Sequence, residues 1–366
     1  MTGIASVLHF LVDGVCGFAM IGRFTSGEDY LINLLLYNFC AFALQMPFGL
    51  ILDYLPCKTR FAKEKCSLFT MGAGCALTAL GAYTHPVILG IGNALFHIGG
   101  GTGVLYEDFA LTKRGKLLGI FVAPGAIGLF LGMNLPKYSF GGVAFLITLI
   151  VLLFGGIAGS FICYFSSKMK QQDFVQNIKS ENDVCLYKEL PDYTAKEKTI
   201  TVVILGLCLF LVVFFRSYVS LSVSFSWKSG FLMGFISVIC VAFGKSLGGI
   251  IASYKGFAIT GFLSLILSAG FFAFGDIPCF GLLALLLFNM TMPLTLYALA
   301  YFMPKMMGFS FGLLTFALFL GYLPKFFGVK FAIDMKYAAA ICAVISVFLL
   351  FPALRKLDME RKEFHN

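Results

Sequence analysis

The sequence predicts an all-α membrane protein with twelve transmembrane helices in two pseudo-symmetric six-helix bundles. Its composition, its twelve long apolar stretches and the likeness of its two halves lead to this prediction. Of the 366 residues, 59% are hydrophobic and 12% are charged, and the mean hydropathy is +0.92. A soluble domain carries about 25% charged residues. Water cannot solvate so apolar a surface, so we expect the chain to lie in a lipid bilayer.

The twelve apolar stretches are each long enough to cross the hydrocarbon core, which needs about 20 residues of helix. Lipid offers no hydrogen-bond partner to a free backbone group, so each stretch is expected to be helical. Their continuous apolar character also differs from the alternation of a membrane β-barrel. The stretches are 3–22, 31–52, 67–84, 86–106, 117–135, 142–165, 199–222, 230–252, 257–275, 278–301, 308–327 and 335–354.

A long polar segment, 166–198, separates the first six stretches from the last six. The sequence therefore predicts an N-terminal six-helix bundle over 1–165 and a C-terminal one over 199–354. Residues 166–198 are expected to be a cytosolic linker, and 355–366 a cytosolic tail.

The positive charges favour one orientation. Most of the 27 Lys and Arg lie in the linker, the tail and the loops on their side of the membrane. Cytosolic loops carry an excess of Lys and Arg, so both termini are placed in the cytosol and the protein in the cytoplasmic (plasma) membrane. The same bias explains the net charge of +9, so no nucleic-acid partner is needed. The eleven Cys include no Cys-x-x-Cys pair, and we expect neither a metal site nor a cofactor.

Short motifs recur at equivalent places in the two halves. Each match is brief, but their shared order indicates duplication, which is one of the known transporter architectures. The matched pairs are 49–54 with 249–254, 95–97 with 287–289, and 129–132 with 318–321.

The loop after the second stretch resembles that of the major facilitator superfamily, Gly-x-x-x-Asp-Arg-x-Gly-Arg-Arg. Gly49, Asp53 and Lys58 fit this gating-loop motif, whereas the second half has Ser253 in place of the acid. The resemblance implies that two rigid bundles rock about a central site. The Gly- and Pro-rich stretch 117–135 is similar to the glycine helix of the family's antiporters.

A narrower set of residues resembles the fosmidomycin-resistance type of efflux transporter. The points of contact are His9 and Asp13 in the first stretch, the Gly90–His97 segment in the fourth, and Arg216-Ser217 in the seventh. This resemblance implies efflux of a drug or toxic compound as one direction of transport.

Asp13, His9 and His97 are the candidates for proton coupling. Ionisable groups within a bilayer are costly, so they indicate function by default. His9 and Asp13 are four residues apart and share one helix face, and Asp13 lies roughly 16 Å from the helix start, near the midplane. An imidazole titrates near neutral pH, which suits His97. The alternatives are a structural hydrogen bond for Asp13 and a neutral packed ring for His97.

The substrate-binding candidates share a polar side chain within an apolar stretch. Arg216 and Lys245 add positive charge, which favours an anionic or zwitterionic organic solute. For both cations, snorkelling to the membrane surface is the alternative. The full candidate set is Arg216, Lys245, Tyr37, Asn38, Asn93 and Asn289.

Glu107 and Asp108 end the fourth stretch, close in sequence to Lys113 and Arg114. A solvated loop pair is the preferred interpretation, and a gate salt bridge is the alternative.

These features together predict a secondary active transporter of a small organic solute, working by alternating access and coupled to protons. An efflux antiporter is the alternative within this class. A membrane-embedded enzyme acting on lipid-linked substrates would need a charged catalytic cluster at an interface, and the sequence contains no such motif. No enzyme activity is therefore predicted, and the expected partners are the solute, protons and the bilayer, with the protein as a monomer.

Overall fold

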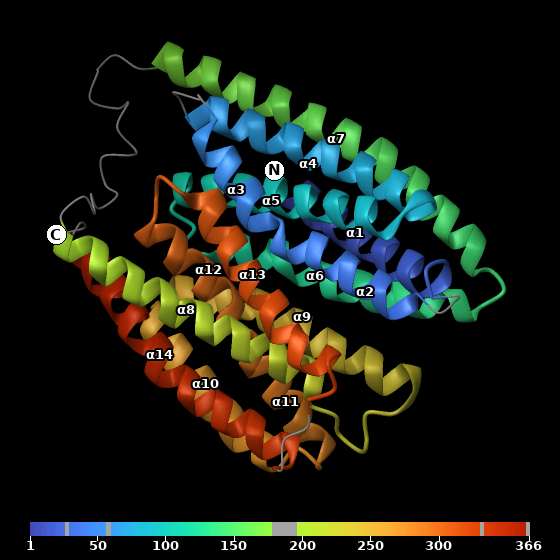
Figure 1. Cartoon of the computed structure of the whole chain (residues 1–366). Helices are drawn as coiled ribbons and strands as arrows, with labels where there is room; N and C mark the ends of the chain where they lie inside the picture. Colours follow the sequence, from blue (N-terminus) through green and yellow to red (C-terminus); the bar gives the residue numbers. More distant parts are fainter. Residues whose placement is uncertain (26–28, 56–59, 178–195, 330–332, 364–366) are drawn as a thin grey trace.

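The computed structural model describes residues 1–25, 29–55, 60–177, 196–329 and 333–363, and these residues form helices and connecting turns with no strand. Figure 1 shows two groups of helices lying side by side, α1 to α7 and α8 to α14. The first group is α1 (Thr2–Gly22), α2 (Tyr30–Asn38), a π-helical turn η1 (Phe39–Ala43), α3 (Gln45–Tyr54), α4 (Arg60–Thr84), α5 (Pro86–Ala110), α6 (Lys116–Asn134), the 3-10 turn η2 (Leu135–Lys137) and α7 (Gly141–Asn177). The second is α8 (Lys196–Ser222), α9 (Gly230–Lys255), α10 (Phe257–Ala273), α11 (Pro278–Asn289), α12 (Thr291–Phe302), α13 (Met307–Phe326) and α14 (Met335–Glu363).

Eleven continuous helical segments of the described chain are long and apolar enough to cross a membrane. In that set α2, η1 and α3 form one span, as do α11 and α12. The twelfth expected span is α10, an apolar helix whose length of 17 residues reaches the lower limit for crossing a membrane. The prediction of an all-α, multi-pass membrane fold is confirmed.

The two halves repeat the same packing. In the first half α1 packs on α6 and α4 packs on α7; in the second half α8 packs on α13 and α10 packs on α14. The halves meet along α3 with α13 and along α6 with α9. Helix α9 is the counterpart of α3, and α13 is the counterpart of α6, so a pseudo-twofold axis converts one of these contacts into the other.

Three helices extend beyond the stretches expected from hydropathy. Helix α4 begins at Arg60 rather than near 67, and α7 continues to Asn177 within the segment expected to be a linker. Helix α14 continues to Glu363, through most of the segment expected to be a tail. Amphipathic turns can extend a helix past the hydrocarbon, where hydropathy no longer detects them. Residues 178–195 of the expected linker lie outside the described part of the chain.

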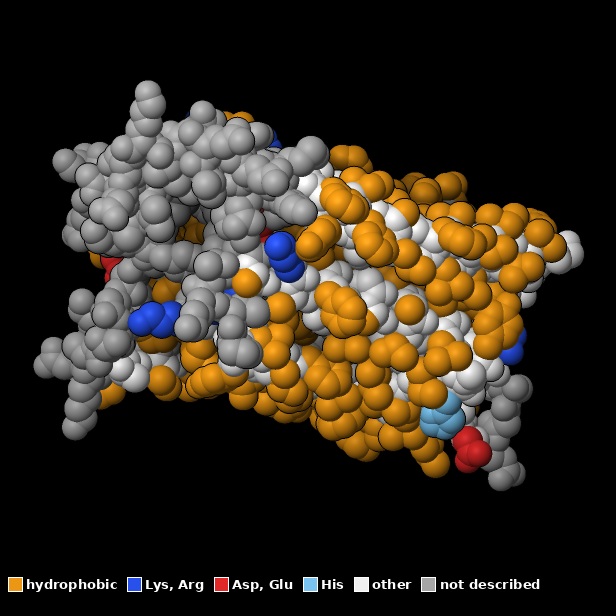
Figure 2. Space-filling model, turned by 90° about the horizontal axis from the view of Figure 1, so that it is seen from above, with side chains coloured by type: hydrophobic (Ala, Val, Ile, Leu, Met, Phe, Trp, Pro, Cys, Tyr) orange, Lys and Arg blue, Asp and Glu red, His pale blue; other side chains and the backbone are white. Residues whose placement is uncertain are grey.

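On the face shown in Figure 2, hydrophobic side chains cover most of the area that the described residues occupy. Phe69, Phe154 and Phe348 are 80%, 71% and 74% exposed, and they lie on α4, α7 and α14 respectively. A soluble monomer rarely exposes a continuous apolar patch of more than a few hundred Å². The bilayer covers this surface.

Candidate functional site

Asp13, His9 and His97, the three candidates for proton coupling, come together inside the first half. His9 Nε2 lies 3.2 Å from Asp13 Oδ2, and His97 Nε2 lies 3.7 Å from Asp13 Oδ1. The two Nε2 atoms lie 2.9 Å apart. None of the three points towards lipid, because their side chains are only 6%, 17% and 12% exposed for His9, Asp13 and His97.

Hydrogen bonds on the far side of each ring fix the tautomers of the two imidazoles. His9 Nδ1 lies 2.8 Å from the carbonyl oxygen of Phe121, and His97 Nδ1 lies 2.9 Å from that of Asn93. A carbonyl oxygen can only accept, so both Nδ1 atoms carry a proton. In two neutral rings the Nε2 lone pairs would then face each other and a carboxylate. A proton between the two Nε2 atoms removes this repulsion, so the arrangement suits a bound cation.

A proline in α6 leaves one backbone carbonyl of that helix free to accept from α1. Pro124 has no N–H, so the carbonyl of Ile120 loses its partner within the helix. The Ser6 hydroxyl donates to that oxygen over 3.4 Å, and the next carbonyl, that of Phe121, accepts from His9. Two successive carbonyls of α6 therefore accept from side chains of α1.

Gly125 of α6 is the closest approach of that helix to the cluster. A Cβ at this position would collide with His9 Nε2 and Asp13 Oδ2. Sequence analysis noted this residue only as part of a glycine-rich stretch. Its contact with the cluster follows from the packing of α6 on α1.

Asn93 bonds directly to Asp13 of the cluster, whereas Tyr37 lies beside the cluster. Asn93 Nδ2 donates to Asp13 Oδ1 over 3.2 Å and lies 3.4 Å from Cys16 Sγ, while Asn93 Oδ1 is buried with no partner in the described residues. Tyr37 is 8% exposed and interacts with Cys16 and Asp13. Sequence reasoning missed Cys16, because a Cys in an apolar stretch gives no polar signal.

Arg216 and Lys245 bring positive charge from the second half. Arg216 on α8 is 4% exposed, so it does not snorkel, and its Nη1 atom has no hydrogen-bond partner in the described residues. Lys245 on α9 is partly buried and interacts electrostatically with both Arg216 and Asp13. Over the described ranges no carboxylate forms an ion pair with either cation. The site therefore has positive charge available to a ligand.

Two candidate asparagines use their side-chain amides in hydrogen bonds within their own helices. Asn38 Nδ2 donates to the carbonyl of Leu34 and Asn289 Nδ2 to that of Leu285, each over 2.8 Å. Both lie beside helix irregularities, since η1 follows Asn38 and the α11–α12 break follows Asn289. Their part in ligand binding stays a prediction.

The gating-loop residues lie where α3 meets α13. Gly49 contacts the backbone of Gly308, and no Cβ would fit between them. Asp53 accepts hydrogen bonds from the backbone N–H groups of Gly308 (2.9 Å) and Phe309 (2.7 Å). A carboxylate at a helix N-terminus satisfies free N–H groups and the helix dipole. Asp53 of one half therefore holds a helix of the other. Lys58 lies outside the described residues.

Carboxylates hold three further helix starts at this end of the bundle, which we call the capped end. Asp108 accepts from the N–H groups of Gly115, Leu117 and Leu118 of α6, over 2.8, 2.8 and 3.1 Å. Glu107 accepts from the N–H and the hydroxyl of Thr2 in α1. Asp358 accepts from the N–H groups of Phe257 and Ala258 in α10.

This pattern corrects the interpretation of Glu107 and Asp108 as a solvated loop pair. Asp108 is fully buried, and its partners are backbone N–H groups rather than the nearby Lys113 and Arg114. The sequence suggested a charge pair because opposite charges were close along the chain. The carboxylate of Asp108 instead accepts from the free N–H groups at the start of α6.

Comparison with known proteins identifies the fold. No protein-family model and no curated protein matches the sequence. Among solved structures, the chain is similar to a variant of the E. coli fucose:proton symporter FucP, with 12% identity, a TM-score of 0.53 and coverage of 97% of this chain and 98% of that chain. It is also similar to the human organic anion transporter MFSD10 (TETRAN), with 13% identity, a TM-score of 0.54 and coverage of 95% and 99%.

These likenesses extend over the whole bundle, so the chain has the major facilitator fold. They do not extend to the fosmidomycin-resistance type, and that narrower resemblance stays a prediction.

Proposed function

We propose that this protein is a secondary active transporter that moves a small organic anion or zwitterion across the cytoplasmic membrane, coupled to protons. The observation that carries the proposal is the Nε2-to-Nε2 hydrogen bond between His9 and His97 beside Asp13, at 2.9 Å. The fold supports it as well, because the two similar structures carry the names of a proton symporter and an organic anion transporter.

The proton site rests on the tautomers of the two rings. With both Nδ1 atoms donating to carbonyls, a hydrogen bond between the Nε2 atoms requires one extra proton, which makes one ring an imidazolium. Asp13 lies beside it and balances its charge. A rearrangement that separates α1 from α5 would remove this shared site and release the proton.

The solute site rests on charge that the protein leaves unbalanced. Arg216 is buried, and leaving a guanidinium without a partner in low dielectric is costly. A carboxylate, phosphate or similar anion that reaches Arg216 and Lys245 would offset this cost. A zwitterion could in addition place its cationic group near Asp13 or the free Oδ1 of Asn93.

Alternating access gives Asp53 a part in the cycle. Its hydrogen bonds to α13 join the two halves at the capped end, so opening that end requires their rupture. We place the capped end and both termini in the cytosol, following the positive charge of its loops. In one direction this cycle performs uptake; in the other it is the efflux antiport suggested by the narrower resemblance.

A membrane enzyme fits the site less well. In the described part of the chain, the cluster with metal-like or catalytic spacing is His9, Asp13 and His97, whose ligand atoms lie within 4.8 Å of one another. This cluster is in the bundle interior rather than at the headgroup level, where a lipid-linked substrate presents its reactive group. The absence of a metal and of a cofactor stays a prediction, as does the monomeric state.

The test is a flux assay in proteoliposomes that contain the full chain. A panel of organic anions and zwitterions is screened with and without a pH gradient, in chelator-treated buffer so that a metal ion at the cluster cannot replace the proton. Asp13→Asn is expected to abolish gradient-driven flux, because the imidazolium loses its counter-ion. Asp276→Asn, which changes an exposed acid outside the cluster, is the matched control and should leave flux unchanged. Flux indifferent to the gradient in the unaltered chain would reject proton coupling.

A further inference from the structure

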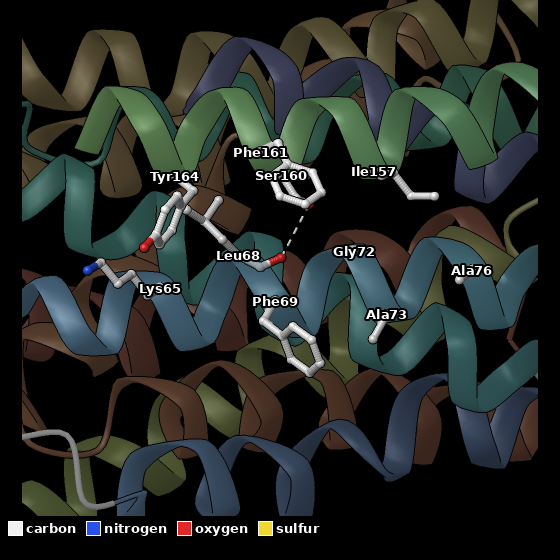
Figure 3. A pocket seen from close by; sticks show the side chains of 10 residues that line it. All are labelled: Lys65, Leu68, Phe69, Gly72, Ala73, Ala76, Ile157, Ser160, Phe161 and Tyr164. Carbon is white, nitrogen blue, oxygen red and sulfur yellow. Dashed lines mark hydrogen bonds between the residues drawn. The ribbon is translucent and has the colours of Figure 1, made fainter. Parts of the chain in front are cut away.

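A groove runs along the lipid-facing side of the first half, between α4 and α7. Its volume is about 620 Å³. Figure 3 shows Lys65 and Tyr164 at one end and Ala76 and Ile157 at the other. The groove faces away from the cluster around Asp13 and takes no part in the proposed transport.

The groove has the length of one bilayer leaflet. Lys65 and Ala76 are eleven residues apart on α4, which corresponds to about 16 Å of helix. Half of the hydrocarbon core measures about 15 Å. Lys65 lies near the start of its span, at the capped end, so the groove reaches from the membrane surface to the midplane of the leaflet on that side.

The lining matches a hydrocarbon chain rather than a polar solute. Small residues on α4 form the floor, and Phe69 and Phe161, which are 80% and 60% exposed, form the rims. The Ser160 hydroxyl, the polar group along its length, already donates to the carbonyl of Leu68 over 3.3 Å (Figure 3). An occupant therefore finds contact area but no free hydrogen-bonding group until the end of the groove.

Positive charge marks that end. The ammonium group of Lys65 lies 5.1 Å from the centre of the Tyr164 ring, within cation–π range. Tyr side chains prefer the headgroup level of a membrane, and a Lys there attracts anionic lipid. The apolar channel and its charged mouth complement a fatty chain joined to an anion.

The corresponding helices of the second half meet through aromatic side chains. There α10 packs on α14, and the rings of Phe262 and Phe351 are 5.7 Å apart. In the first half, Phe69 of α4 and Phe161 of α7 are instead 80% and 60% exposed and line the groove.

We propose that this groove binds one acyl chain of an anionic phospholipid from the leaflet at the capped end, with its phosphate at Lys65. This lipid site is separate from the proposed transport site. Its occupant supplies the packing that aromatic side chains supply in the second half.

The experiment measures lipid retained by the purified full chain, using native mass spectrometry after incubation with phosphatidylglycerol or with phosphatidylethanolamine of the same acyl chains. We expect selective retention of phosphatidylglycerol. Lys65→Gln should lower that retention about fivefold, since one Lys near the surface contributes about 1 kcal/mol towards an anionic lipid. Ala76→Phe should lower retention of both lipids, because the new ring fills the groove.

Matched controls change equivalent residues elsewhere. Lys255→Gln removes an exposed cation at the end of α9, and Val203→Phe adds a ring at a position of α8 that is 65% exposed. Both should retain phosphatidylglycerol as the unaltered chain does. Equal retention of the two lipids would overturn headgroup recognition, and full retention by Ala76→Phe would overturn the site itself. The experiment measures bound lipid rather than flux. Rejection of the lipid site would therefore leave the transport proposal intact, and rejection of transport would leave the lipid site intact.

Discussion

The two halves of this protein share a fold but hold their charges in opposite ways. In the first half, Asp13, His9 and His97 form a closed cluster in which each charged or titratable group has a partner within 3.7 Å. In the second half, Arg216 and Lys245 have no carboxylate partner among the described residues, and Arg216 is 4% exposed. At the position matching His97, the second half carries Asn289, which cannot titrate.

This difference suggests a division of labour between two duplicated bundles. A cluster that is satisfied by one bound proton can serve as the coupling site, whereas unbalanced cations can serve an anion brought from outside. Rocking of the bundles would alter the distance between the two sites, which gives coupling a physical basis. The following experiments would break or sharpen this comparison.

The largest effect on the affinity for the solute is expected at the second-half cation. Arg216→Gln should lower the apparent affinity for the transported anion by about 100-fold, since loss of one partner of a buried charge pair costs at least 2–3 kcal/mol. The empty protein should become more thermally stable, because an unpaired buried cation has been removed. Concentration-dependent flux and thermal unfolding measure the two effects. Arg216→Lys retains the charge and should show a smaller loss, while unchanged affinity in the Gln variant would remove Arg216 from the site.

The second effect concerns the packing of the first-half cluster. Gly125→Ala places a methyl group against His9 Nε2 and Asp13 Oδ2, so α6 or the cluster must move. Overpacking of this kind costs about 1–3 kcal/mol, and coupling to the pH gradient should fall about tenfold or more. Gly270→Ala is the control on α10, where a Cβ meets no atom within 4 Å. Normal coupling in Gly125→Ala would show that the cluster geometry is not critical.

A third, smaller effect tests the contact that joins the halves. Asp53→Ala removes the cap of α13, at a cost of about 1 kcal/mol. Hydrogen exchange should therefore accelerate about fivefold at the amides of Gly308 and Phe309, the two groups that Asp53 accepts from. The control is Ser253→Ala at the position of the second half that matches Asp53. The Ser253 hydroxyl donates to the carbonyl of Ile250 within its own helix. Equal acceleration at Gly308 and Phe309 in both variants would contradict the role of Asp53 as the cap of α13.

The smallest effect is expected at Asn289. Its amide donates to the carbonyl of Leu285 one turn earlier in α11, so Asn289→Ala should change flux by less than about twofold, in line with a hydrogen bond worth about 0.5 kcal/mol. His97→Asn, which gives the first half the residue of the second, should in contrast abolish coupling. Similar losses in the two variants would break the proposed division between the halves.

The sequence singled out Asp13, His9 and His97 individually, by residue type and depth, and the structure brings them together. His9 and Asp13 are one helical turn apart, so their proximity follows from local geometry. His97 lies 84 residues after Asp13, and only the packing of α1 against α5 places its Nε2 beside Asp13. Gly125 and Cys16 carried no signal, because a small or apolar residue becomes part of a site only through its neighbours.

The acids at the capped end show the limit of sequence reasoning. Asp108 and Glu107 are near Lys and Arg along the chain, which suggested charge pairing, yet they accept from the first N–H groups of α6 and α1. A helix start is an attractive partner only once it has been packed close by. For Glu107 that helix start is at Thr2, far from it in the sequence of the first half, and the packing of α1 against α5 brings the two together.

By itself, the sequence determined the membrane environment, the helical class and the duplication, because these depend on residue type averaged over spans of about 20 residues. The tertiary structure decided which charges are paired, which are left for a ligand, and which seam between helices stays open. These outcomes depend on single atoms from distant helices meeting within about 3 Å, and such meetings are fixed by packing rather than by composition.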